Sequence, residues 1–94
     1  KISLKAINAY DDPGFVPLEL SFSDAENLLN RANVEADNAT ISRSEHALLS
    51  LEDGKWYLEN RTSKLATSLV LTRKHELESG DIVILGDRVF EVRF

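Results

Sequence analysis

Basic side chains in the middle of the sequence are the residues best suited to bind a ligand. They are Arg31, Arg43, Arg61 and Lys64. A guanidinium can donate paired hydrogen bonds to a phosphate, and a lysine ammonium acts as a compact positive charge. Salt screens charges beyond about 8 Å, so a local basic cluster can hold one anion although the formal net charge is −5. The sequence therefore predicts an anion site if the fold brings these side chains together.

Other residues suggest catalysis or metal binding, but their surroundings do not support it. Ser44 and His46 could belong to a catalytic triad, yet no Gly-x-Ser-x-Gly motif surrounds the serine. His46 and His75 lack the paired spacing of a zinc site. Asp11 and Asp12 are not followed by the further acidic ligands of a calcium loop. We therefore expect no metal, no cofactor and no enzyme activity.

The composition is typical of one small soluble domain spanning residues 1–94. A chain of 94 residues buries roughly two thirds of its unfolded surface. It contains no cysteine, which fits a reducing, cytoplasmic compartment. The negative charge argues against nucleic-acid and membrane partners. Because methionine is absent, Lys1 is interpreted as a cut end within a longer protein.

Short runs of alternating apolar and polar residues predict β-strands separated by turns. The expected strands are residues 2–7, 16–22, 40–42, 46–51, 55–58, 67–72, 82–85 and 89–94. The run 82–85 is continuously apolar and is expected to be covered on both faces. Turn signals recur about every ten residues, at 11–14 and 77–81 among others, which favours an antiparallel sandwich or barrel.

Two dipeptides predict tight hairpin turns. Asp53-Gly54 tolerates the positive φ angles of a two-residue turn, and Gly86-Asp87 suits a turn with glycine first. In the strand after the first turn, Trp56 and Leu58 share one face, as expected for a half-buried strand. Trp56 is therefore expected to anchor the core.

Residues 23–36 leave two interpretations open. Ser23 and Glu26 form a possible capping box, and the apolar residues that follow recur at helical spacing. Three asparagines within the segment and the short strands around it argue against a helix. Local signals alone do not choose between them.

From residue 28 to residue 94, the order of these pieces resembles the forkhead-associated (FHA) domain. The corresponding segments here are Asn30-Arg31, Arg43-Ser44-Glu45-His46-Ala47, Trp56-Tyr57-Leu58-Glu59-Asn60, Ser63-Lys64-Leu65-Ala66-Thr67, and the closest match, Leu77 to Gly86. The resemblance implies an all-β antiparallel sandwich of about ten short strands, whose end loops bind phosphothreonine peptides in typical members. It also favours a short strand at 28–30 over the helix.

The resemblance implies specific roles for several residues. Arg31 corresponds to the arginine that contacts phosphate in the family. Arg43 stands where the family usually has a phosphate-binding serine. Ser42 or Ser44 could substitute if the loop is shifted by one residue, and Ser44 is the nearer candidate to act with His46. Strand alternation would place Ser44 on the same side as Ser42 and His46. His46 is expected to brace the loops rather than to do chemistry.

The segment 63–67 departs most from the family pattern. Lys64 replaces the usual threonine and can contribute a charge near a phosphate. Leu65 replaces an asparagine that can hold the peptide backbone, so only apolar contact remains there. Asn60, at the end of the preceding strand, is expected to support the loops together with His46.

Two functions follow from these residues. In the first, Arg31, Arg43, Ser44 and Lys64 surround one phosphate, and the domain binds a phosphothreonine-containing peptide or protein. In the second, the altered loop has lost the phosphate, and the domain is a phosphate-independent interaction or assembly module. The grouping of basic residues in the expected loops ranks the first function slightly ahead.

Overall fold

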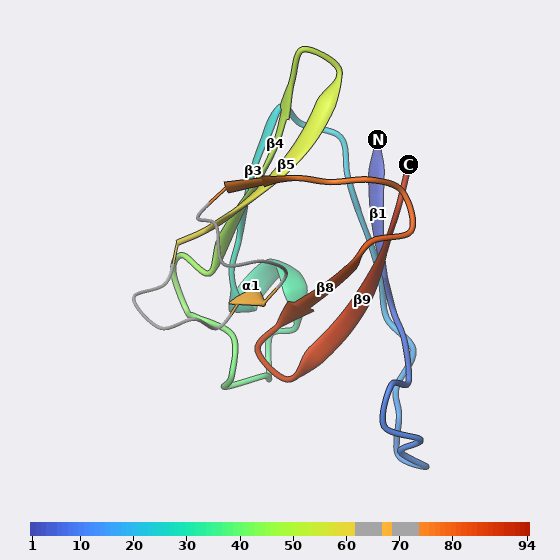
Figure 1. Cartoon of the computed structure of the whole chain (residues 1–94). Coiled ribbons are helices and arrows are strands. Elements are labelled where there is room, and N and C mark those ends of the chain that lie inside the picture. Colours follow the sequence, from blue (N-terminus) through green and yellow to red (C-terminus); the bar gives the residue numbers. More distant parts are fainter. Residues whose placement is uncertain (62–66, 69–73) are drawn as a thin grey trace.

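The structure is a computed structural model that describes residues 1–61, 67–68 and 74–94. Two antiparallel sheets face each other in a sandwich (Figure 1). The five-stranded sheet has the order β2 (Glu19–Phe22), β1 (Ile2–Ala6), β9 (Arg88–Arg93), β8 (Ile82–Leu85) and β6 (Thr67–Ser68). The four-stranded sheet has the order β3 (Glu26–Leu29), β4 (Ala47–Glu52), β5 (Lys55–Asn60) and β7 (Lys74–Glu76). The predicted all-β antiparallel sandwich is confirmed, with nine strands among the described residues where about ten were expected.

The core lies between the sheets and is formed mainly by alternate residues of their strands, with Val34, Ile41 and Leu77 added from outside the strands. Its largest fully buried side chains include Phe90, Ile2, Leu4, Leu29, Ile41 and Leu49. Trp56 is 4% exposed, which confirms its predicted place in the core. Burial of each such side chain stabilises the fold by about 1.5–3 kcal/mol.

Both predicted hairpins are present. Glu52 pairs with Lys55 across Asp53 (φ 52°) and Gly54 (φ 78°), the positive angles of a two-residue turn. Residues 85 and 88 pair in the same way across Gly86, whose φ is 61°. The first turn lies at one end of the sandwich, and the second lies at the other end together with α1 (Figure 1).

Residues 26–34 form a short strand followed by one helical turn, α1 (Arg31–Val34). The possible capping box at Ser23 and Glu26 is wrong, because Glu26 lies in β3. The actual capping box joins Asn30 and Asn33, and the Asn33 side chain also donates to the Leu28 carbonyl at 2.7 Å. The asparagines that argued against a helix therefore cap a shorter one.

Three strand predictions need correction. Strand β2 begins at Glu19 rather than Val16, because Pro17 has no N–H to donate and Val16 is 63% exposed. Strand β8 is fully covered on one face only: Val83 and Leu85 are buried, whereas Ile82 is 42% exposed and Ile84 is partly exposed. Residues 40–42 do not form a strand: Thr40 lies in a turn and Ile41 in a bend. Of the predicted strand 67–72, residues 69–72 lie outside the described residues.

Candidate functional site

The connection between β3 and β4, residues 30–46, contains most of the predicted site residues. Hydrogen bonds hold it at both ends: the Arg31 N–H donates to the Ser42 carbonyl at 2.9 Å, and the His46 N–H donates to the Leu29 carbonyl at 2.9 Å. Between them, Val34 and Ile41 are buried in the core. The connection is thus anchored to the sandwich rather than extending freely into solvent.

Arg31 opens α1, and its side chain turns back onto the same connection. Its Nε donates to the Ile41 carbonyl at 3.0 Å, and Nη2 donates to the Ala39 carbonyl at 3.3 Å. The remaining guanidinium N–H groups have no acceptor among the described residues. Two backbone contacts therefore fix the plane of the guanidinium and leave part of its donor edge available for an anion.

His46 is fully buried at the start of β4 and joins three segments. Its Nδ1 accepts a hydrogen bond from the Ser42 N–H at 2.9 Å, so this nitrogen carries no proton. Its backbone N–H donates to Leu29, and its carbonyl accepts from the Arg61 N–H at 3.0 Å. The half-buried Asn60, last residue of β5, lies opposite Ala47.

Arg43 and Ser44 are exposed on the same connection, one and two residues beyond Ser42. The strand alternation expected from Ser42 to His46 is wrong, because bends interrupt these residues. Bends remove the rule that residues two apart share a face. The Ser42 backbone, rather than the Ser44 side chain, makes the hydrogen bond to the imidazole.

Lys64 and Leu65, with the rest of segment 62–66, lie outside the described residues. The structure therefore places Arg31, Arg43 and Ser44 on one connection, without describing the segment predicted to complete the site. Convergence of these residues and Lys64 on a single phosphate stays a prediction.

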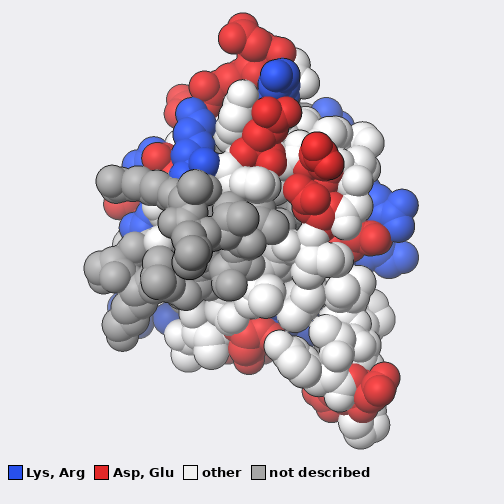
Figure 2. Space-filling view, viewed as in Figure 1, with Lys and Arg blue, Asp and Glu red and all other residues white. Residues whose placement is uncertain are grey.

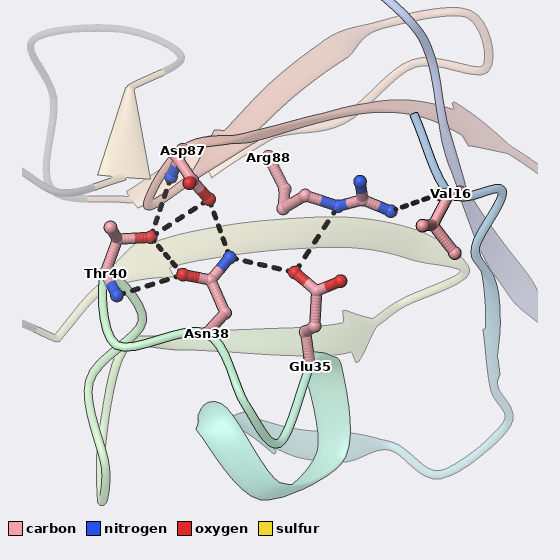
Figure 3. Close-up of polar contacts among 6 residues, drawn as sticks. All are labelled: Val16, Glu35, Asn38, Thr40, Asp87 and Arg88. Atoms are coloured by element: carbon pink, nitrogen blue, oxygen red, sulfur yellow. Dashed lines mark hydrogen bonds and ion pairs between the residues drawn. The ribbon is translucent and has the colours of Figure 1, made fainter. Parts of the chain in front are cut away.

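A polar cluster that the sequence did not reveal joins the β3–β4 connection to the β8–β9 turn (Figure 3). The Asn38 Nδ2 donates to Asp87 Oδ1 at 2.6 Å and to Glu35 Oε1 at 2.9 Å. Thr40 lies beside them: its Oγ1 accepts from the Asp87 N–H at 3.0 Å and is 2.5 Å from Asn38 Oδ1. Asp87 is 49 positions from Asn38 and 47 positions from Thr40 in sequence, and no local pattern pairs them.

Arg88 links this cluster to the connection between β1 and β2. Its Nε lies 3.5 Å from Glu35 Oε1, and Nη2 donates to the Val16 carbonyl at 2.8 Å (Figure 3). Its guanidinium also lies over the Phe15 ring, 5.4 Å from the centroid, a favourable cation–π distance. The Arg88 side chain, from the first residue of β9, thus joins the β1–β2 and β3–β4 connections.

Charge on the face seen in Figure 2 is dispersed among the described residues. Acidic side chains occupy the tip of the β4–β5 hairpin and the β1–β2 connection at the lower right, with basic groups between and beside them. Glu52, Asp53, Asp11 and Asp12 are the exposed acidic residues of these two turns. The net charge of −5 therefore says little about the potential near Arg31.

Comparison with known proteins identifies the fold. A model of the FHA domain matches residues 25–86 of the chain. A solved structure from a structural and functional analysis of phosphothreonine-dependent FHA domain interactions has a TM-score of 0.71 and 20% identity, covering 99% of this chain and 95% of that one. The FhaA FHA domain complexed with the intracellular domain of Rv3910 has a TM-score of 0.74 and 19% identity, covering 99% and 100%. No curated protein matches the sequence.

Proposed function

Because this chain belongs to the FHA domain family, we propose that it is an interaction module that binds a phosphothreonine-containing segment of a partner protein. The single observation that supports this best is the fixed guanidinium of Arg31, held by the carbonyls of Ala39 and Ile41. No α-helix in the described residues is long and apolar enough to cross a membrane. The proposed partner is a protein, bound through the β3–β4 connection and the neighbouring loops.

The proposed chemistry is recognition of a phosphate that carries about −1.5 to −2 charges at neutral pH. A charge-assisted hydrogen bond contributes about 1.5–3 kcal/mol. Arg31 is ordered before the ligand arrives, so less side-chain entropy is lost on binding. Preorganisation of this kind favours a specific anion site over a solvated surface arginine.

Further residues are proposed to take part in binding. Arg43 and Ser44 are exposed on the β3–β4 connection, where they can add donors to the phosphate. Lys64 would add a charge, and Leu65 would contact the peptide without hydrogen bonds. His46 supports this end by fixing the Ser42 backbone. Because Leu65 has no side-chain amide, we expect it to bind the peptide backbone more weakly than an asparagine would.

A peptide titration tests the proposal. A library of phosphothreonine peptides and their unphosphorylated twins is titrated into the wild type, Arg31→Ala and Arg31→Lys. We expect binding that requires the phosphate, is lost in Arg31→Ala and is only partly retained in Arg31→Lys, which keeps the charge but not the paired donors.

Arg93→Ala is the matched control, because it removes the same charge from an exposed strand-end arginine paired with Glu91. It should bind as the wild type does. Equal binding of the phosphorylated and unphosphorylated twins would overturn the proposal and select the phosphate-independent module. Equal weakening by Arg31→Ala and Arg93→Ala would assign the effect to overall charge and exclude a specific role for Arg31.

A further inference from the structure

The β8–β9 turn docks onto the connection that fixes Arg31. A Cβ added to Gly86 would lie 2.9 Å from the Thr40 backbone carbonyl oxygen and would overlap the Thr40 hydroxyl oxygen. The next residue, Asp87, donates its N–H to the Thr40 hydroxyl and accepts from Asn38. Gly86 therefore allows the turn to pack closely against Thr40, in addition to adopting the positive φ angle of the turn.

Asn38 is the residue on which this contact depends. Its Nδ2 donates to Asp87 and Glu35, and its Oδ1 accepts from the Thr40 N–H at 2.9 Å and the Thr40 hydroxyl (Figure 3). A primary amide offers two donors and two acceptor sites, so every hydrogen-bonding site of the Asn38 side chain has a partner. Few rotations of Asn38 would preserve this set of contacts.

The carbonyls that hold Arg31 belong to residues directly beside this cluster. Ala39 lies between Asn38 and Thr40, and Ile41 follows Thr40. Fixing Asn38 and Thr40 against Asp87 therefore fixes the two carbonyl oxygens that accept from the Arg31 guanidinium. Hydrogen bonds and neighbouring backbone residues thus form a continuous path from Asp87, in the β8–β9 turn, to the Arg31 guanidinium.

We infer that Asn38 and Asp87 are positioning residues for Arg31, acting through the Ala39 and Ile41 carbonyls. The expected effect of these residues on peptide binding rests on the proposed function. The positioning itself is a property of the unliganded protein. Glu35 reinforces it, because Arg88 holds the same carboxylate that accepts from Asn38.

Two nearly isosteric variants separate hydrogen bonding from charge. Asn38→Asp replaces the donating Nδ2 with an oxygen that faces the carboxylates of Glu35 and Asp87, so repulsion should release the connection. Asp87→Asn keeps an Oδ1 that can accept from Asn38 and removes a charge, so it should preserve the geometry. Asn8→Asp is the matched control: Asn8 also bridges a loop, through bonds to Asp12.

The first measurement uses NMR of the unliganded protein. In the wild type, Asp87→Asn and Asn8→Asp, we expect the Arg31 Nε–H to exchange slowly with solvent, because it donates to Ile41. In Asn38→Asp its exchange should approach that of a free arginine. An Arg31 Nε–H that stays equally protected in folded Asn38→Asp would overturn the inference.

The second measurement is affinity for the phosphothreonine peptide selected from the library. Asn38→Asp should weaken binding about tenfold, the equivalent of one charge-assisted hydrogen bond, while both other variants bind within about twofold. If Asn38→Asp does not fold, Thr40→Val, which removes the bridging hydroxyl, takes its place in both measurements. If the wild type does not distinguish the peptide twins, the proposed function fails, and the NMR result still decides the positioning.

Discussion

His46 accepts a hydrogen bond at Nδ1 from the backbone N–H of Ser42, 2.9 Å away, inside a fully buried environment. We predict that His46→Ala destabilises the fold by about 2–4 kcal/mol, from the cavity and from the unsatisfied Ser42 N–H. Urea denaturation measures this loss. His75→Ala, a half-buried histidine in β7, is the comparison and should cost less. Similar losses for both would show that His46 has no special bracing role.

The contact between Gly86 and Thr40 predicts that two turn glycines differ in their tolerance of alanine. Both Gly54 (φ 78°) and Gly86 (φ 61°) are left-handed, so alanine is strained by about 1–2 kcal/mol at either. Space is open around Gly54, whereas a Cβ at Gly86 meets Thr40. Gly86→Ala should therefore lose more free energy of unfolding than Gly54→Ala. Equal losses in urea denaturation would contradict the close contact.

The asparagine capping box predicts a measurable contribution of α1 to stability. Asn30 accepts from the Asn33 N–H at 3.2 Å, and the Asn33 side chain accepts from the Asn30 N–H at 2.8 Å. Asn30→Ala should cost about 1 kcal/mol, while Asn30→Asp keeps the acceptor and should cost less. Thermal unfolding monitored by circular dichroism checks both. A harmless Asn30→Ala would show that burial of Val34 alone holds the turn.

The ion pair of Glu52 and Lys74 predicts a pKa change that NMR can follow. The hydrogen bond from Lys74 Nζ, at 2.7 Å, lowers the pKa of Glu52, and the same bond raises the pKa of Lys74. Lys74→Gln should therefore raise the pKa of Glu52 toward its ordinary value. Lys55→Gln is the control: Lys55 pairs with Glu52 in register, yet its ammonium lies 4.0 Å from Glu76. An unchanged Glu52 pKa in Lys74→Gln would refute the pair.

The sign of the pH dependence follows from these shifts. Because the folded pKa of Glu52 is depressed, its stabilising contribution is present above the unfolded pKa and is lost as pH falls through the folded one. The raised pKa of Lys74 gives a contribution that is present below its unfolded pKa and is lost as pH rises through the folded one. Both contributions are small because the pair is exposed, and added salt should weaken them.

Local patterns predicted the sandwich because its strands are short and its turns carry their own chemistry. Asp53-Gly54 and Gly86 adopt positive φ angles that few other residues tolerate, so these turns were visible in the sequence. Alternation likewise placed Trp56 inside. The sequence did not decide the structure of residues 23–36, because an asparagine side chain can either cap a short helix or disfavour a longer one. Here Asn30 and Asn33 cap the short helix α1.

The sequence alone determined the two hairpins, because each depends on turn residues close together in the chain, and it indicated the fold family through the order of its motifs. Only the tertiary structure decided what holds the Arg31 guanidinium and why Gly86 must lack a side chain. The first depends on the Ala39 and Ile41 carbonyls that accept from Arg31, and the second depends on contacts between residues 38–40 and 86–87. Hydrogen bonds and close packing between such distant segments leave no periodic signal, because their geometry exists only once both sheets have assembled.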